Sequence, residues 1–150
     1  MINPSLANKS LPKTAIPTRI RFGSPAHDST GIETAEIEKI IKKATTHFPK
    51  LQTIAIVEVA TGTCLAYAGT RGINPTVAAA QNAEVVRRQS LVMKEFAMRG
   101  ERLEDILIPF RKQLHLIRLA KNGQWFGYLV VKAQDTSLAL AREVLKSIIA

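Results

Sequence analysis

Histidine and cysteine are the side chains of this sequence that could serve as metal ligands or nucleophiles, and the chain holds few of them. His27, His47 and His115 fall in three separate segments, and none has a cysteine or carboxylate beside it at metal-ligand spacing. Cys64 is the only cysteine, so it forms no internal disulfide and no cysteine-based metal cluster. We interpret Cys64 as a small buried strand residue and His115 as a structural strand residue, and we expect neither a metal nor a cofactor.

Phosphate-binding loops and activated serines are the next motifs that could do chemistry. The segment 69–72 has two glycines but lacks the lysine and the spacing of a P-loop. Ser90 and Ser137 belong to helical segments, outside the strand-turn-helix context of a nucleophile elbow. Glu104 and Asp105 are adjacent acids, but neighbours on a strand point to opposite faces of the sheet. The sequence therefore predicts no active site, and we expect a protein that is not an enzyme.

Composition is that of a single globular domain with an excess of positive charge. The chain has 150 residues, of which 46% are hydrophobic and 22% charged. No apolar run approaches the roughly 18 residues of a membrane span, and residues 1–10 hold no apolar core of a signal peptide. We therefore expect a cytoplasmic protein. The formal charge of +9 favours acidic partners, which include nucleic acid, a membrane surface or an acidic protein, without choosing among them.

The first 29 residues differ from the rest of the chain. They carry four prolines, little hydrophobic periodicity, and four basic residues ahead of the first acid, Asp28. Because frequent prolines oppose helix formation, we predict a flexible basic tail over 1–29. A short extended piece over 18–22 could still lie against the domain, which we place at 30–150.

The remaining residues alternate between helical and strand patterns. Three helices are expected over 32–47, 74–99 and from 135 to the end, and five strands over 51–60, 64–68, 103–110, 114–120 and 125–132. The first of these strands is apolar on both faces, so helices must cover both sides of the sheet. The order helix, two strands, helix, three strands, helix predicts an α+β fold, a three-layer α/β/α sandwich around a five-stranded antiparallel sheet.

Helix ends and sheet edges are indicated by individual residues. Ser29 and Thr30 supply capping oxygens before the first helix, and Asn74-Pro75 is a strong start for the second. Gly100 is expected to end that helix in a left-handed conformation. Pro109 lacks a ladder donor and so places its strand at an edge of the sheet.

The helix that follows Asn74 is longer than the width of a small domain, about 35–40 Å at about 1.5 Å per residue. Its broad apolar side is expected to cover the sheet and contains Ala78, Ala79, Val85, Val86, Val92, Met93, Phe96 and Ala97. Leu91 and Met98, seven residues apart, lie instead on the polar side, in line with Glu84 and close to Arg87. Two apolar residues at this spacing predict a second, narrow seam for a partner helix.

Two amides and one strand add to this picture. Asn82 and Gln89 lie within the apolar side of the long helix, where they either mark its overhang beyond the sheet or bond to local backbone. The edge strand exposes Ile106, Ile108 and Phe110, and a bare hydrophobic edge favours aggregation unless it is paired or covered. We predict that it pairs with its own copy in a homodimer.

A resemblance to a known family is carried by residues 54–59 running into 65–66, residues 83–86, the Asn-Gly hairpin running into 128–131, and residues 138–142. In pattern and order, residues 32–149 resemble the Roadblock / dynein-light-chain family. The resemblance implies a Roadblock-like, profilin-like architecture and a dimer formed through the edge strand and the long helix. Family members often have an acidic residue and a glycine in the first hairpin turn, and Thr61-Gly62 here leaves the register of that hairpin open.

The resemblance also implies a function. Many relatives bind or regulate small Ras-like GTPases, with bacterial members linked to a GTPase in gliding motility, and others are scaffold subunits. We expect a non-catalytic, homodimeric regulator or adaptor of a small GTPase. Its expected interface comprises Glu84, Arg87, Leu91, Met98, Ile106, Ile108 and Phe110.

Two alternatives remain open at this point. One is a structural scaffold subunit, paired with a paralogue as a heterodimer. The other is a nucleic-acid-binding module that uses a basic surface of Arg88, Lys94, Arg99 and Arg102 beside Arg87. Only 5% of residues are aromatic and no base-reading motif is present, so nucleic acid is the less favoured partner.

Overall fold

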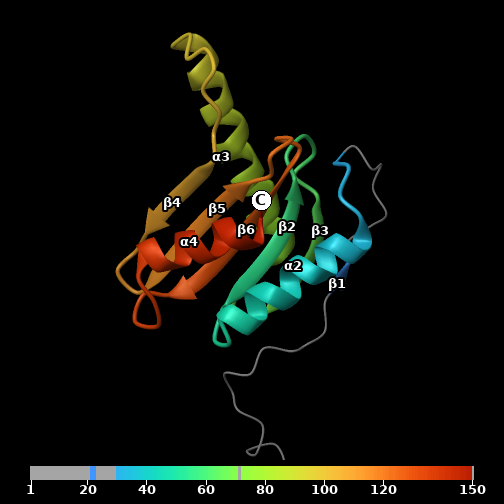
Figure 1. Cartoon of the computed structure of the whole chain (residues 1–150), viewed down its shortest axis with the longest axis vertical. Coiled ribbons are helices and arrows are strands. Elements are labelled where there is room, and N and C mark those ends of the chain that lie inside the picture. Colours follow the sequence, from blue (N-terminus) through green and yellow to red (C-terminus); the bar gives the residue numbers. More distant parts are fainter. Residues whose placement is uncertain (1–20, 23–29, 71, 150) are drawn as a thin grey trace, which may run out of the picture.

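The computed structural model describes residues 21–22, 30–70 and 72–149 (Figure 1). The elements along the chain are β1 (Arg21–Phe22), α2 (Thr34–His47), β2 (Thr53–Glu58), β3 (Cys64–Gly69), α3 (Pro75–Glu95), β4 (Asp105–Pro109), β5 (Gln113–Leu119), β6 (Trp125–Lys132) and α4 (Leu138–Ile148). Their types and order agree with the pattern in the sequence.

All strands belong to one antiparallel sheet in the order β1-β3-β2-β6-β5-β4. The five predicted strands are confirmed, with β2 in the interior and β4 at the edge that Pro109 indicated. The two residues of β1 add a sixth strand, in which Arg21 pairs with Tyr67 and Phe22 with Ala66. This pair lies within the extended piece expected over 18–22. Residues 1–20 and 23–29 of the predicted tail lie outside the described residues.

Helices cover both faces of the sheet, as predicted. In Figure 1, α2 and α4 lie in front of the sheet and α3 lies behind it. Strand β2 supplies both interfaces: Ile54 and Ile56 pack in the cluster beneath α2 and α4, whereas Ala55 and Val57 pack in the cluster beneath α3. All six residues of β2 are buried, which is why its pattern is apolar on both faces.

The first predicted helix begins two residues later than expected, and the prediction that Thr30 caps it is wrong. Helix α2 starts at Thr34, and its N-cap residue, Glu33, makes no side-chain capping bond. Thr30 Oγ1 instead accepts from the backbone N–H of Ile32 at 3.4 Å, within a turn where Gly31 has a φ of +69°. Ser29 lies outside the described residues. The chain therefore turns once more before it becomes helical.

Helix α3 begins where predicted and ends early. Asn74 Oδ1 accepts from the backbone N–H groups of Thr76 (3.0 Å) and Val77 (3.3 Å), which confirms the cap. The helix ends at Glu95 rather than Arg99 because Ala97 adopts a left-handed conformation with φ +49°. Gly100 is also left-handed, at φ +78°, but it belongs to the turn that follows the helix. The 21 helical residues span about 31 Å.

The β2–β3 hairpin has a definite register that its turn residues explain. A bulge lies between Ile56 and Val57, and Thr61 Oγ1 donates to the carboxylate of buried Glu58 at 2.5 Å. Gly62 has a φ of +72°, and a Cβ there would lie 3.2 Å from the Cα of Ala80. Glycine thus allows both the turn and its close approach to α3.

Candidate functional site

Helix α3 is buried against the sheet only in its first half. Its buried residues are Ala79, Ala83 and Val86. From Arg88 to Arg102 every side chain except that of Met93 is exposed. Figure 1 shows this part of α3 projecting beyond the sheet before the chain returns to β4. We call residues 88–102 the arm.

The prediction that the whole apolar side of α3 covers the sheet is therefore wrong. Val92 and Phe96 of that side are 37% and 72% exposed, because the sheet ends beneath Val86 while the apolar pattern continues. Leu91 and Met98, the predicted second seam, are also exposed. Hydrophobic side chains are thus exposed on more than one side of the arm, whereas a helix that faces only solvent carries polar residues there.

The two amides of the apolar side behave differently. Asn82 is half-buried, and its Nδ2 donates to the backbone carbonyl of Ala78 at 2.8 Å, which is the local bond that was one of the two alternatives. Gln89 is exposed on the arm. The overhang therefore begins between these two residues.

Arg87 fastens the base of the arm to the hairpin. Its guanidinium donates to the carbonyl oxygens of Val59 (2.6 Å) and Ala60 (3.4 Å) and to Glu84 Oε2 (2.9 Å). The hydrogen bond and charge of Arg87 lower the pKa of Glu84. Both residues were predicted to contact a partner, and both are engaged within their own chain.

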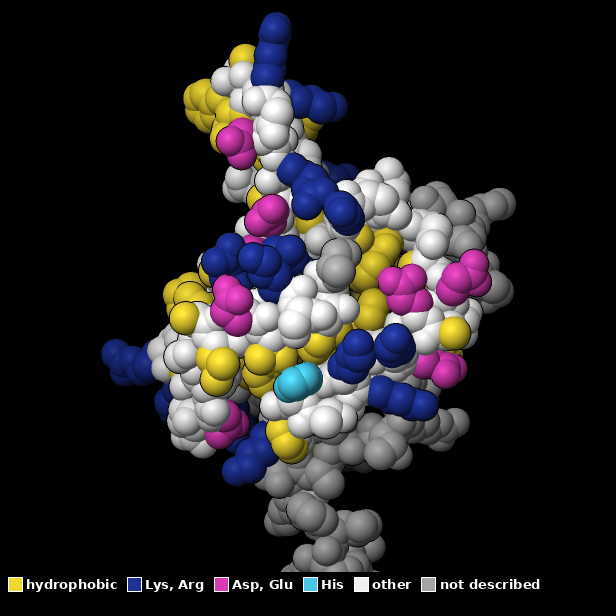
Figure 2. All heavy atoms as spheres, in the orientation of Figure 1, with side chains coloured by type: hydrophobic (Ala, Val, Ile, Leu, Met, Phe, Trp, Pro, Cys, Tyr) yellow, Lys and Arg dark blue, Asp and Glu magenta, His cyan; other side chains and the backbone are white. Residues whose placement is uncertain are grey.

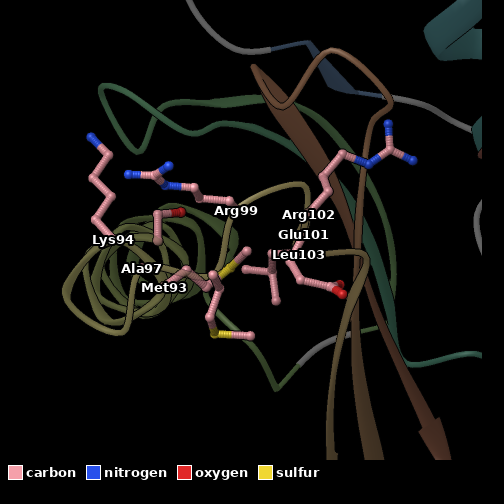
Figure 3. A pocket seen from close by; sticks show the side chains of 9 residues that line it. Met93, Lys94, Ala97, Arg99, Glu101, Arg102 and Leu103 are labelled. Atoms are coloured by element: carbon pink, nitrogen blue, oxygen red, sulfur yellow. The ribbon is translucent and has the colours of Figure 1, made fainter.

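A groove lies within the arm, between its helical part and the chain that returns toward β4. Its volume is about 560 Å³, and it is lined by Ser90, Met93, Lys94, Ala97, Met98, Arg99, Glu101, Arg102 and Leu103. Figure 3 shows Lys94 and Arg99 on the helix side of this groove and Arg102 on the side of the returning chain. The groove therefore combines apolar walls with three cations and the carboxylate of Glu101.

The predicted basic surface lies entirely on the arm. Arg88 pairs with Glu84 at 3.5 Å, and Arg102 pairs with Glu104 at 3.9 Å. Lys94 and Arg99 take part in no ion pair among the residues that the structure describes. In Figure 2 the projecting part of the molecule has hydrophobic side chains on one flank and basic side chains on another.

The edge strand β4 carries the second group of predicted interface residues. Ile106 and Ile108 are half-buried, and Phe110 just beyond the strand is 55% exposed. Cross-strand pairing of Ile106 with Ile117 and of Ile108 with His115 places them on the face that α3 covers elsewhere. This face remains open over β4 because α3 crosses β2 and β3 instead.

His115 is a structural residue of that open face. Its Nε2 lies 3.0 Å from Gln113 Oε1 and its Nδ1 lies 2.8 Å from the Tyr128 hydroxyl. Because an amide oxygen only accepts, Nε2 carries the proton and Nδ1 accepts from Tyr128. The ring also meets Phe110 edge-on, with centroids 4.8 Å apart, and burial lowers the pKa of His115. These contacts hold Phe110 in place at the end of the edge strand.

An ion-pair cluster that the sequence analysis missed anchors the start of β4 on the other face. Asp105 pairs with Arg118 of β5 at 3.1 Å and with Arg142 of α4 at 3.0 Å. Asp105 and Arg118 are almost fully buried. A buried arginine in an otherwise apolar strand was the signal for a nearby acid, but its identity depends on strand register. The cluster fixes the point where the arm joins the sheet.

The residues first considered for chemistry are dispersed in the structure. Burial raises the pKa of the Cys64 thiol to about 11, which leaves little nucleophilic thiolate near neutral pH. Ser90 Oγ donates to the Val86 carbonyl, and Ser137 caps α4 by accepting from the N–H of Leu140. No group of three or more His, Cys, Asp or Glu side chains that could hold a metal occurs within the described ranges. In the same ranges, no helix is both long enough and apolar enough to cross a membrane.

Several solved structures share this arrangement of helices and strands. MglB of Myxococcus xanthus is 18% identical over 78% of this chain and 86% of that one, with a TM-score of 0.65. A Roadblock/LC7 domain from Streptomyces avermitilis is 10% identical over 73% of this chain and 88% of its own, with a TM-score of 0.62. The chain has the Roadblock/LC7 fold.

Sequence identity to these solved structures is low, so the likeness is one of fold. No protein-family model matches the sequence, and no curated protein matches it either. A further solved structure, described as MglB with tetrameric arrangement, is 12% identical, covers 83% of this chain and 92% of its own, and has a TM-score of 0.66.

Within this fold the predicted interface residues form two groups that do not meet. Leu91 and Met98 lie on the arm, which precedes the Asp105 end of β4. Ile108 and Phe110 lie toward the opposite end of that strand. A single copy therefore has an apolar projection at one end of its edge strand and an open apolar strip toward the other.

Proposed function

We propose that this chain is a non-catalytic, dimeric protein-interaction module that regulates, or serves as an adaptor for, a small Ras-like GTPase. The observation that carries the proposal is the exposed apolar surface of the arm. Exposed single hydrophobic residues are ordinary. An arm with Leu91, Phe96 and Met98 exposed together, next to an open edge strand, favours association instead.

A twofold axis through the middle of β4 would bury the apolar residues of both groups at once. Antiparallel pairing of β4 with its copy brings the Asp105 end of one strand beside the Pro109 end of the other. Since the arm ends just before Asp105, each arm would lie near Ile108 and Phe110 of its partner. The apolar projection of one copy would then cover the open strip of the other, and two α3 helices would run side by side.

Pro109 limits how much of this contact the strands can provide. Proline has no N–H to donate, so the ladder between two copies of β4 would lack one bond in each strand. Most of the stabilisation would then come from burial of arm side chains, at about 1.5–3 kcal/mol for each fully buried Leu or Phe. This makes the arm the right place to test the dimer.

Sedimentation equilibrium of the purified chain tests the dimer directly. We expect a dimer for the wild type and a shift toward monomer for Leu91→Asp, with Kd raised about 100-fold or more because two copies of the charge enter the interface. Leu140→Asp is the matched control: Leu140 is 57% exposed, against 56% for Leu91, but lies on α4. A wild-type monomer at high concentration would overturn the proposal, and equal masses for both variants would remove Leu91 from the interface.

The GTPase is tested separately. The purified chain is mixed with the small GTPase encoded nearest to its gene, loaded with GDP or with a non-hydrolysable GTP analogue. We expect binding that prefers one nucleotide state, because a regulator must distinguish the two. Absence of binding in both states would contradict a GTPase partner while leaving the dimer intact. A mass that reaches the dimer only after a paralogue is added would support the heterodimeric scaffold instead.

A further inference from the structure

A second feature lies at the end of the sheet remote from the arm. The residue before β2, the turn between β4 and β5, and the end of β6 meet there. Backbone bonds hold them together: Gln52 N–H donates to the Val130 carbonyl at 2.8 Å, and Ala133 N–H donates to the Lys112 carbonyl at 3.0 Å. A pocket of about 450 Å³ lies among these segments, lined by Gln52, Arg111, Lys112, Gln113, Lys132, Ala133 and Gln134.

The charge of this pocket is of one sign. Arg111, Lys112 and Lys132 line it, and no carboxylate does. None of these three cations forms an ion pair within the part of the chain that the structure describes. Cations brought together without acids repel one another and raise the positive potential in a concave site. An anion is therefore the complementary occupant.

The glutamines of the pocket are held in a definite orientation. Gln113 Nε2 donates to Gln52 Oε1 at 2.6 Å, while Gln113 Oε1 faces His115 Nε2 at 3.0 Å. His115 is in turn bonded to Tyr128, which is almost fully buried. This bond uses Gln52 Oε1 as the acceptor, so the Gln52 amide nitrogen can still donate its N–H groups to a ligand. The pocket thus contains three positive charges and the Gln52 amide, whose orientation is fixed by the hydrogen bonds that lead to buried Tyr128.

We propose that this pocket binds a phosphate group. A phosphate carries nearly two negative charges and several acceptor oxygens, which matches a cluster of cations and an amide donor better than a single carboxylate does. Arginine can bind two phosphate oxygens through its planar guanidinium, and the lysines add point charges. The phosphate belongs either to a small soluble molecule or to a lipid headgroup, and both present the same chemistry to Arg111, Lys112 and Lys132.

Calorimetric titration of the full-length chain with inorganic pyrophosphate tests the site. The variant Arg111→Ser/Lys112→Ser/Lys132→Ser removes its charges. The matched control, Lys39→Ser/Lys42→Ser/Lys43→Ser, removes the same number of charges from the exposed side of α2. We expect saturable binding by the wild type and the control, and affinity at least about tenfold lower in the pocket variant.

Flotation with vesicles distinguishes the two sources of the phosphate. Phosphatidylcholine vesicles with and without a phosphoinositide are mixed with the same three proteins. Recruitment that depends on the phosphoinositide and is lost in the pocket variant identifies a lipid headgroup, whereas pyrophosphate binding without recruitment identifies a soluble ligand. Equal weakening in the pocket and control variants, or no binding of either probe by the wild type, would overturn the site. Circular dichroism of all three proteins establishes that they are folded.

Discussion

Helices cover the two faces of the sheet to different extents. The difference distinguishes residues that form the core from residues that remain exposed. Helices α2 and α4 close one face, where Leu116 and Leu129 are fully buried. Helix α3 closes only part of the other face and then leaves it, so that Phe96 and Phe110 remain exposed. The closed face buries its apolar side chains within one copy, whereas the open face leaves apolar surface that we propose is buried by a second molecule.

The sharpest test of this difference is a pair of leucine truncations. Leu116→Ala on the closed face is expected to lower the free energy of unfolding by about 2–5 kcal/mol, because it leaves a cavity in a close-packed core. Leu91→Ala on the arm should change the stability of the monomer by less than about 0.5 kcal/mol. Urea denaturation at low protein concentration measures both. Similar losses for the two variants would mean that the arm packs within its own chain.

The next effect concerns the ion-pair cluster that ties the open edge to the closed face. Asp105→Ala removes the nearer acid partner of the buried Arg118 guanidinium, and we expect a loss of about 3 kcal/mol in unfolding free energy. Glu101→Ala, an exposed acid on the arm, is the control and should have little effect. A small loss in Asp105→Ala would show that Glu104, 3.9 Å from Arg118, replaces it.

A smaller effect is expected on association. Phe96→Ser and Phe110→Ser should each raise the dimer Kd about tenfold, because each removes an aromatic ring from the proposed contact. If the arm of one copy covers the strip of the other, the double variant should lose less than the sum of the two single losses. Sedimentation equilibrium of the wild type, the two single variants and the double variant gives the four Kd values of this double-mutant cycle. Strict additivity would place the two rings in separate contacts.

The smallest expected effect is a dependence on pH. Burial lowers the pKa of His115 below its ordinary value of 6.5, so the unfolded chain takes up the proton first as pH falls. The contribution of the neutral ring is therefore complete above pH 6.5 and is lost as pH falls from there toward the lower pKa of the folded state. His115→Asn should flatten this part of the curve of unfolding free energy against pH. An unchanged slope would exclude His115 as its source.

Most of the fold could be predicted from the sequence, because several local signals agreed. The doubly apolar strand required helices on both faces, Asn74-Pro75 marked the start of α3, and Pro109 marked the edge. The end of α3 could not be predicted, since alanine favours helix and yet Ala97 adopts a left-handed conformation. Local propensity carries no information about where the tertiary contacts of a helix cease.

The candidate site was predictable only in part, because residue spacing does not show where a helix leaves the sheet. Spacing on α3 identified Leu91 and Met98 as residues outside the sheet-covering side, and both are exposed. Spacing also assigned Phe96 to the covered side, because it does not reveal where the sheet ends. The cluster of Asp105, Arg118 and Arg142 joins residues 13 and 37 positions apart and depends on strand register, which a single sequence does not specify.

The short strand β1 has a consequence for how many copies can join. A sheet with two free borders can add subunits without limit and grow into fibres. Among the described residues, the two edge strands differ in length, since β1 has two residues and β4 has five. If two copies meet through β4, the described edge strand on each side of the joined sheet is β1, which has only two residues. So short an edge strand offers few unpaired backbone groups to a further copy, which favours a closed pair over a fibre.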